Sequence, residues 1–145
     1  MKMKKLIKQW TVPVLCGLFI FIMFRFVFFI GYIPSESMEP EIKTGSYIIG
    51  YRFVGEISHG DVIVFNQDGF MLVKRVAAVP GDVIYINDSG GVISFNEEIP
   101  HSARIFTVPD ECYFVLGDNT GNSDDSRLWK DPFIKKTQII AKVYQ

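Results

Sequence analysis

Residues 59–81 read HGDVIVFNQDGFMLVKRVAAVPG, and this stretch decides the fold class. It holds two short apolar runs, 61–65 and 71–79, between the turn signals His59-Gly60 and Pro80-Gly81. No segment of helical periodicity competes with such runs after residue 33. The others are 46–53, 83–86, 92–95, 112–116 and 139–144. We therefore predict a mainly β domain, an antiparallel β-sandwich or partly open barrel, in which NDSGG at 87–91 forms a hairpin loop.

The segment before this domain predicts one transmembrane helix. Residues 10–33 contain a single charge, Arg25, and 24 residues at about 1.5 Å each suffice to cross a hydrocarbon core of roughly 30 Å. A cleavable signal would end in a small-x-small site, but the exit here reads FIGYIP. We expect a retained anchor, with 1–33 as basic N-terminus and anchor and 34–145 as the outer domain. Arg25 is close enough to the exit to reach the outer headgroups.

The charge distribution sets the orientation and excludes one class of partner. Lysines at positions 2, 4, 5 and 8 precede the span and predict a cytoplasmic N-terminus. The residues after position 33 carry 10 basic and 16 acidic side chains, a net charge of −6. Such a surface repels phosphate backbones, which argues against nucleic-acid binding. Cys16 and Cys112 lie on opposite sides of the boundary and suggest no disulfide, and with His59 and His101 they show no metal-ligand spacing.

Three polar segments interrupt the apolar pattern. They are PSESMEP at 34–40, VKRV at 73–76 and GDNTGNSDDSR at 117–127. Each has a structural explanation: a Pro-bounded turn, an edge strand protected by lysine, and a surface loop. A calcium-loop interpretation of 117–127 fails, because Ser123 stands where an EF-hand needs glycine and Trp129 where it needs glutamate.

Together the three segments suggest nucleophilic catalysis. A serine hydroxyl needs a neighbouring base, and a lysine serves when burial lowers its pKa so that it is neutral. We therefore consider Ser37 as nucleophile and Lys74 as base, with the Ser37 N–H and the Ser35 hydroxyl as oxyanion donors. The alternative is a triad in which His59 or His101 activates Ser37. Both histidines fall in turns, which disfavours it.

At these residues the sequence resembles bacterial type I signal peptidases, which are membrane-bound Ser/Lys endopeptidases. The resemblance covers most of the chain and resides in an ordered set of motifs. They are PSESMEP at 34–40, GSYII at 45–49, GDVIVF at 60–65, KRVAAVPGD at 74–82, GDN at 117–119 and NSDDSR at 122–127. The sequence shows no counterpart of the second domain found in larger members, and in this it resembles the minimal forms typical of Gram-positive bacteria.

The resemblance implies a role for each matching residue. Ser37 and Lys74 would be the catalytic dyad, Ser35 and the Ser37 N–H the oxyanion hole, and Ser123 the residue that orients Lys74. Asp125 and Arg127 would form a supporting ion pair, and Ile33 and Met38 would lie near the pocket for a small substrate side chain. It implies no metal and no organic cofactor. Departures from the pattern concern substrate preference and loop geometry; they are Ala78, Glu41-Ile42 and Thr120-Gly121.

The expected function is cleavage of signal peptides from exported preproteins at the outer face of the cytoplasmic membrane. The expected partners are those signal peptides and membrane lipid. Ser37 lies four residues beyond Ile33, within roughly 14 Å of the end of the apolar run, so substrates should be presented at the membrane surface. One alternative is a noncatalytic, membrane-anchored peptide-binding protein of the same fold. A self-cleaving Ser/Lys protease of the repressor type fits an anchored, acidic protein poorly.

Overall fold

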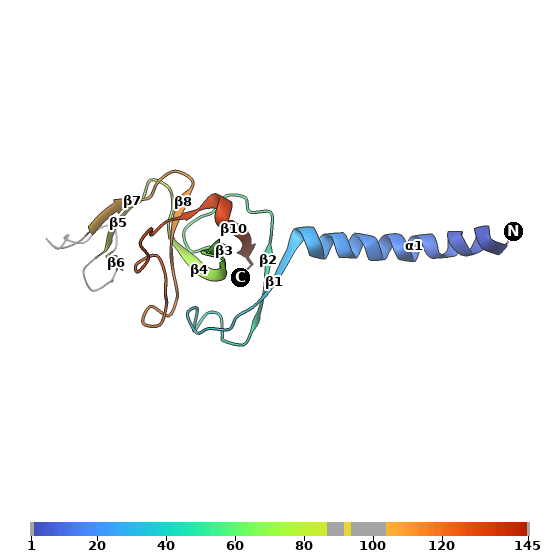
Figure 1. Cartoon of the computed structure of the whole chain (residues 1–145), viewed down its shortest axis with the longest axis horizontal. Helices are drawn as coiled ribbons and strands as arrows, with labels where there is room; N and C mark the ends of the chain where they lie inside the picture. Colours follow the sequence, from blue (N-terminus) through green and yellow to red (C-terminus); the bar gives the residue numbers. More distant parts are fainter. Residues whose placement is uncertain (1, 87–91, 94–103, 145) are drawn as a thin grey trace.

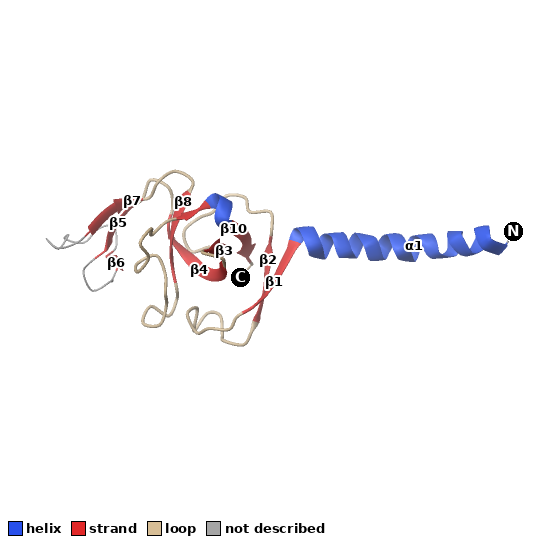
Figure 2. Cartoon of the chain, viewed as in Figure 1, coloured by secondary structure: helices blue, strands red, loops and turns tan. Residues whose placement is uncertain are grey.

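The computed structural model describes residues 2–86, 92–93 and 104–144 of the chain. A long helix, α1 (Lys2–Ile22), projects from a β domain and continues through a π-helical turn at Met23–Val27 (Figure 1). The rest is almost entirely strand and loop (Figure 2). The strands are β1 (Phe28–Tyr32), β2 (Tyr47–Tyr51), β3 (Val62–Gln67), β4 (Phe70–Ala78), β5 (Val83–Ile86), β6 (Val92–Ile93), β7 (Arg104–Thr107), β8 (Cys112–Leu116), β9 (Ile134–Lys135) and β10 (Ile139–Val143), with a 3-10 turn at Lys136–Gln138.

The strands form two antiparallel sheets. The larger has the order β1-β2-β10-β3-β4-β8-β9, and the smaller has the order β6-β5-β7. The mainly β, antiparallel class with one N-terminal apolar helix is therefore confirmed. The predicted hairpin is found as the pairing of β5 with β6, while its loop at 87–91 lies outside the described residues. β7 and β9 were not predicted.

The helix ends earlier than the sequence predicts. The expected helical span ran to Ile33, but residues 28–32 form β1, which pairs with β2 from Phe28↔Tyr51 to Tyr32↔Tyr47. A continuous apolar run does not by itself distinguish helix from buried strand. Here the strand is favoured because Phe29 and Ile33 are buried in the domain core. Residues Gln9–Val27 remain long and apolar enough to cross a membrane.

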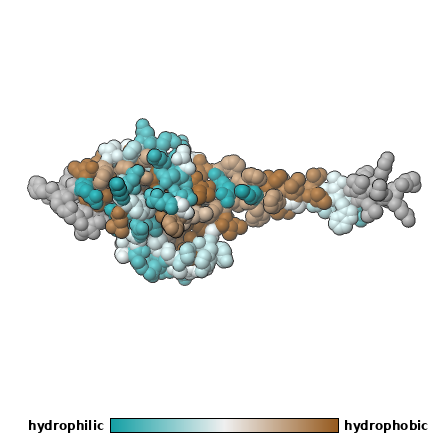
Figure 3. Space-filling view, viewed as in Figure 1, coloured by the Kyte–Doolittle hydropathy of each residue, from teal (hydrophilic) through white to brown (hydrophobic). Residues whose placement is uncertain are grey.

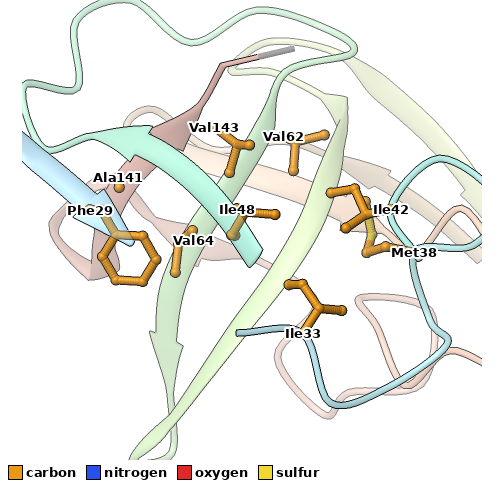
Figure 4. Close-up of a cluster of buried hydrophobic side chains, with 9 residues drawn as sticks. All are labelled: Phe29, Ile33, Met38, Ile42, Ile48, Val62, Val64, Ala141 and Val143. Atoms are coloured by element: carbon orange, nitrogen blue, oxygen red, sulfur yellow. The ribbon is translucent and has the colours of Figure 1, made fainter. Parts of the chain in front are cut away.

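The core supports the loop that follows β1. The central strand β3 is buried on both faces, with Val62 and Val64 in one apolar cluster and Ile63 and Phe65 in another. Met38, only 1% exposed, inserts from the loop into the first cluster (Figure 4). Nine side chains from β1, β2, β3, β10 and the loop make up this cluster: Phe29, Ile33, Met38, Ile42, Ile48, Val62, Val64, Ala141 and Val143. The backbone around Ser37 is therefore fixed by burial of its neighbour.

Candidate active site

Ser37 and Lys74 meet at the end of β1. Ser37 lies in the turn-rich loop after that strand, and Lys74 lies in the middle of β4, opposite Ile63 of β3. Lys74 Nζ donates a hydrogen bond to Ser37 Oγ over 2.7 Å, and both residues are buried. Because β4 lies between β3 and β8, the edge-strand interpretation of Lys74 is wrong.

The surroundings of Lys74 favour its neutral form. Burial lowers the pKa of the Lys74 ammonium, because the charged form loses its hydration. Asp125, Asp124 and Asp118 oppose this by attracting the charge, but the net pKa remains below the ordinary lysine value. A neutral amine 2.7 Å from a hydroxyl is in position to accept its proton.

A small cavity of about 110 Å³, the Ser37 cavity, opens beside this pair. Its walls include the two expected pocket residues, Ile33 and Met38, and also Ser35, Ser37 and Lys74. Ser35 Oγ lies 3.4 Å from Ser37 Oγ. The Ser35 and Ser37 hydroxyls therefore lie side by side at the wall of the same cavity.

The loop 117–127 provides rigid support behind the dyad. The Arg127 guanidinium donates two hydrogen bonds to the Asp125 carboxylate, at 2.8 and 2.9 Å, and Gly117 N donates to Asp125 Oδ2 over 3.0 Å. The structure thus contains the expected ion pair between Asp125 and Arg127, and Asp125 is fully buried. Arg127 also donates to the carbonyl oxygen of Thr120 over 2.9 Å. The departure at Thr120 leaves this bond intact because the backbone accepts it.

Ser123 is placed differently from the expectation. Its hydroxyl is buried and makes no hydrogen bond of ordinary geometry in the described chain, so the expected bond to Lys74 is absent. Ser123 Oγ packs against Gly117, where even a Cβ atom would collide with it. It is also near enough to Asp125 to help lower the pKa of that carboxyl. Lys74 instead directs its hydrogen bond to Ser37.

Asn119 and Asn122 make three further contacts that hold the Ser37 loop, and sequence reasoning did not assign them. Asn119 N donates to the Ser37 carbonyl oxygen over 3.0 Å, and Asn119 Nδ2 donates to the Glu36 carbonyl oxygen over 3.2 Å. Asn122 Nδ2 donates to the Glu36 carboxylate. The density of Asn and Asp in 117–127 was the available signal, since amide side chains often fix neighbouring loops.

Arg75, the neighbour of Lys74, points away from the dyad and ties β4 to the same loop. Its Nε and Nη2 atoms each lie 2.7 Å from an oxygen of Asp118. Its Nη1 donates to the Gly60 carbonyl oxygen over 2.8 Å. Adjacent residues of a strand face opposite sides, so one cation can contact Ser37 while the next anchors Asp118.

The histidine alternative is not supported by the geometry. His59 Nε2 lies 2.6 Å from Asp82 Oδ2 in an exposed pair, whereas Ser37 Oγ accepts its hydrogen bond from Lys74 Nζ. His101 lies outside the described residues. A buried serine and lysine beside a small cavity define a candidate serine hydrolase of the Ser/Lys class.

Comparison with known proteins identifies the family. The profile described as "Signal peptidase, peptidase S26" matches residues 4–104 and 94–144. Signal peptidase I S of Bacillus subtilis (strain 168) is 30% identical, over 92% of this chain and 85% of that protein. Signal peptidase IB of Staphylococcus aureus (strain COL) is 31% identical, over 97% of this chain and 89% of that protein. The chain belongs to the signal peptidase family, peptidase S26.

Coverage differs among the relatives. The chain spans 56% of the length of signal peptidase I of Pseudomonas aeruginosa, with 27% identity over 72% of this chain. A crystal structure of a signal peptidase I from Enterococcus faecalis V583 aligns with a TM-score of 0.47 and 25% identity, over 63% of this chain and 99% of that one.

Proposed function

We propose that this protein is a serine endopeptidase that removes signal peptides from exported preproteins, with Ser37 as nucleophile and Lys74 as general base. The observation that carries the proposal is the buried contact of 2.7 Å between Lys74 Nζ and Ser37 Oγ. Membership of the signal peptidase family supports the choice of substrate.

The geometry suggests how the two residues divide the reaction. Lys74 takes the proton of Ser37 as Oγ attacks the scissile carbonyl carbon, and the resulting oxyanion is held by the Ser37 N–H and the Ser35 hydroxyl. Lys74 then gives that proton to the leaving amine as the peptide C–N bond breaks, which leaves an acyl group on Ser37. In the second half Lys74 deprotonates a water that attacks this ester and returns the proton to Ser37.

The direct test is cleavage of a preprotein that carries an Ala-x-Ala site by the full chain in detergent. We expect a single cut after that site, read by intact mass spectrometry. Cuts at many positions, or none by a folded protein, would contradict the proposed specificity.

The pH profile should report the lysine base. Activity requires neutral Lys74, so kcat/KM should rise tenfold per pH unit on the acid side and level off near the Lys74 pKa, which burial sets below the ordinary value of 10.5. A His59→Ala variant should keep the same profile. A profile that is flat throughout the acid range would argue against a lysine base.

We also propose that the helix spans the cytoplasmic membrane once, with its lysine-rich end inside and residues 34–145 outside. The lysines at positions 2, 4, 5 and 8 favour a cytoplasmic N-terminus. The segment Gln9–Val27 is long and apolar enough to cross a membrane. Because β1 begins directly after the π-helical turn, the catalytic domain would lie at the outer surface of the membrane.

In this arrangement the outward face of β1 and β2 contacts the membrane lipid. Neither strand contains a charged residue, and cross-strand pairs such as Ile30↔Ile49, at 55% and 57% exposure, point to solvent. Hydrophobic side chains continue from the helix onto the adjacent part of the domain (Figure 3). Tyrosines on this face suit the headgroup region, where a ring is half immersed. The exposed members are Ile30, Tyr32, Tyr47, Ile49 and Tyr51, and Tyr144, just after β10, packs against Tyr51.

A spin label should measure this contact. In a variant with Cys16 and Cys112 replaced by serine, a nitroxide at Ile49→Cys in proteoliposomes should be protected from a water-soluble relaxation agent. The matched position is Ile105→Cys, a residue that is 57% exposed. It belongs to β7, the strand at the end of the domain away from α1 (Figure 1). Equal accessibility at the two positions would show that the β1–β2 face is in water.

A further inference from the structure

A second cavity lies beyond Ser35 and is not used by the mechanism above. This Glu36 cavity has a volume of about 310 Å³, against about 110 Å³ for the Ser37 cavity. The two cavities share Pro34 and Ser35 as walls, so they meet at the proposed oxyanion donor. A peptide whose scissile carbonyl lies at Ser37 therefore has room on both sides of the cleaved bond. The lining residues of the Glu36 cavity are Pro34, Ser35, Glu36, Thr44 and Asn122.

The position of the membrane determines which cavity receives the residues before the cleaved bond and which receives those after it. An apolar groove along β1 and β4 shares Tyr32, Met71 and Val73 with the Ser37 cavity. Since β1 runs from the helix end toward Ser35, the order along the chain is groove, Ser37 cavity and Glu36 cavity. The apolar part of a signal peptide remains on the membrane side. The residues after the cleaved bond then fall in the Glu36 cavity.

The walls of this cavity hold a fixed negative charge. The Glu36 carboxylate accepts a hydrogen bond from Asn122, while Asn119 holds its backbone carbonyl. On the other wall, Thr44 donates through N and Oγ1 to Glu39 Oε1, at 3.1 and 2.8 Å. These bonds, the backbone one foremost, lower the pKa of Glu39 and keep it ionised, while Lys43 lies near it. The five lining residues include a carboxylate and no basic side chain.

We propose that the Glu36 cavity binds the first residues after the cleaved bond and that Glu36 favours a basic side chain there. The proposal rests on the proposed peptidase function. A carboxylate already oriented by Asn122 needs no reordering to meet a lysine or arginine of the substrate. Because Glu36 is exposed, the expected gain in kcat/KM is modest, about two- to fivefold for one ion pair, and it should decrease with salt.

The test uses three matched peptides that share an apolar segment and an Ala-x-Ala site and differ only at the second residue after the cut, which is Lys, Ala or Glu. The full chain in detergent should cleave them in the order Lys, Ala, Glu at low salt, with Lys and Glu separated by about four- to 25-fold if each charge contributes similarly. In Glu36→Gln the three rates should converge. The matched control is Glu56→Gln, an exposed carboxylate remote in sequence from the cavity, which should keep the wild-type order.

The outcomes separate this inference from the function on which it rests. No cleavage of any peptide would contradict the peptidase itself. Cleavage of all three at equal rates by the wild type would leave the peptidase intact and overturn the role of Glu36. A preference that persists in Glu36→Gln would also overturn it, because another group would then be the source of the selectivity.

Discussion

Replacing Ser37 by alanine should reduce kcat/KM for preprotein cleavage by several orders of magnitude, because no other hydroxyl is bonded to Lys74 among the contacts of the described chain. Loss of the nucleophile from a serine protease costs on the order of 10⁶-fold. Ser35 Oγ lies 3.4 Å from Ser37 Oγ, but Lys74 donates its hydrogen bond to Ser37 and not to Ser35 among the described contacts, so Ser35 should not substitute. The measurement is single-turnover cleavage followed by mass spectrometry.

The Lys74→Met variant separates catalysis from folding. Methionine has a similar length but no amine, so cleavage should decrease by at least about 10²–10⁴-fold. The thermal unfolding midpoint should not decrease. Burial disfavours the charged form of Lys74 in the folded protein, and methionine carries no charge to bury. Ser58→Ala and Lys130→Ala change exposed residues and should retain wild-type rates. Appreciable cleavage by Lys74→Met would refute the dyad.

The strands were predictable because alternation and apolar runs are local properties. The runs at 61–65 and 71–79 became β3 and β4 with small shifts at their ends. Residues 28–32 were misassigned because their apolar character fits a membrane helix equally well. Only the pairing of β1 with β2, which is nonlocal, decides for a strand.

The site was predictable in its parts and less so in its contacts. The approach of Ser37 and Lys74 followed from family resemblance, since 37 positions separate them in the chain. The bonds of Asn119 and Asn122 to the Ser37 loop join segments more than 80 residues apart, and no local pattern encodes them. The expectation for Ser123 was incomplete because its hydroxyl packs against Gly117, a contact that depends on the shape of the loop.

Removing Asp125 should be the most destabilising single change in the site. The carboxylate is fully buried, and its loss leaves the Arg127 guanidinium, itself only 11% exposed, without the negative charge that it pairs with. Breaking a buried ion pair in this way costs about 3–5 kcal/mol. It also leaves Gly117 N without an acceptor, in the loop whose Asn119 holds Ser37. Asp125→Ala should therefore lower the unfolding midpoint by roughly 10 °C, while the exposed Asp110→Ala should not.

The pH dependence of that difference identifies the charge as its cause. Burial alone raises the pKa of Asp125, but the bonds from Arg127 and Gly117 outweigh it and the net pKa is lowered. The carboxylate therefore stabilises the fold fully above the unfolded value of about 3.9, and this contribution is lost as pH falls through the lower folded value. The gap between wild type and Asp125→Ala should be constant from about pH 5 to 7 and narrow below about pH 4.

The same substitution should also change the base. Asp125 raises the pKa of Lys74, and Arg127 lowers it. Removal of Asp125 leaves the positive charge of Arg127 unopposed within this ion pair, so the pKa of Lys74 should decrease. The acid limb of any remaining activity should move to lower pH, while the maximum rate decreases because the Ser37 loop is less firmly held. An acid limb that moves to higher pH, or a midpoint that does not change, would contradict the proposed support of the dyad by Asp125. The two readouts together test whether the loop 117–127 acts on Lys74 by charge as well as by position.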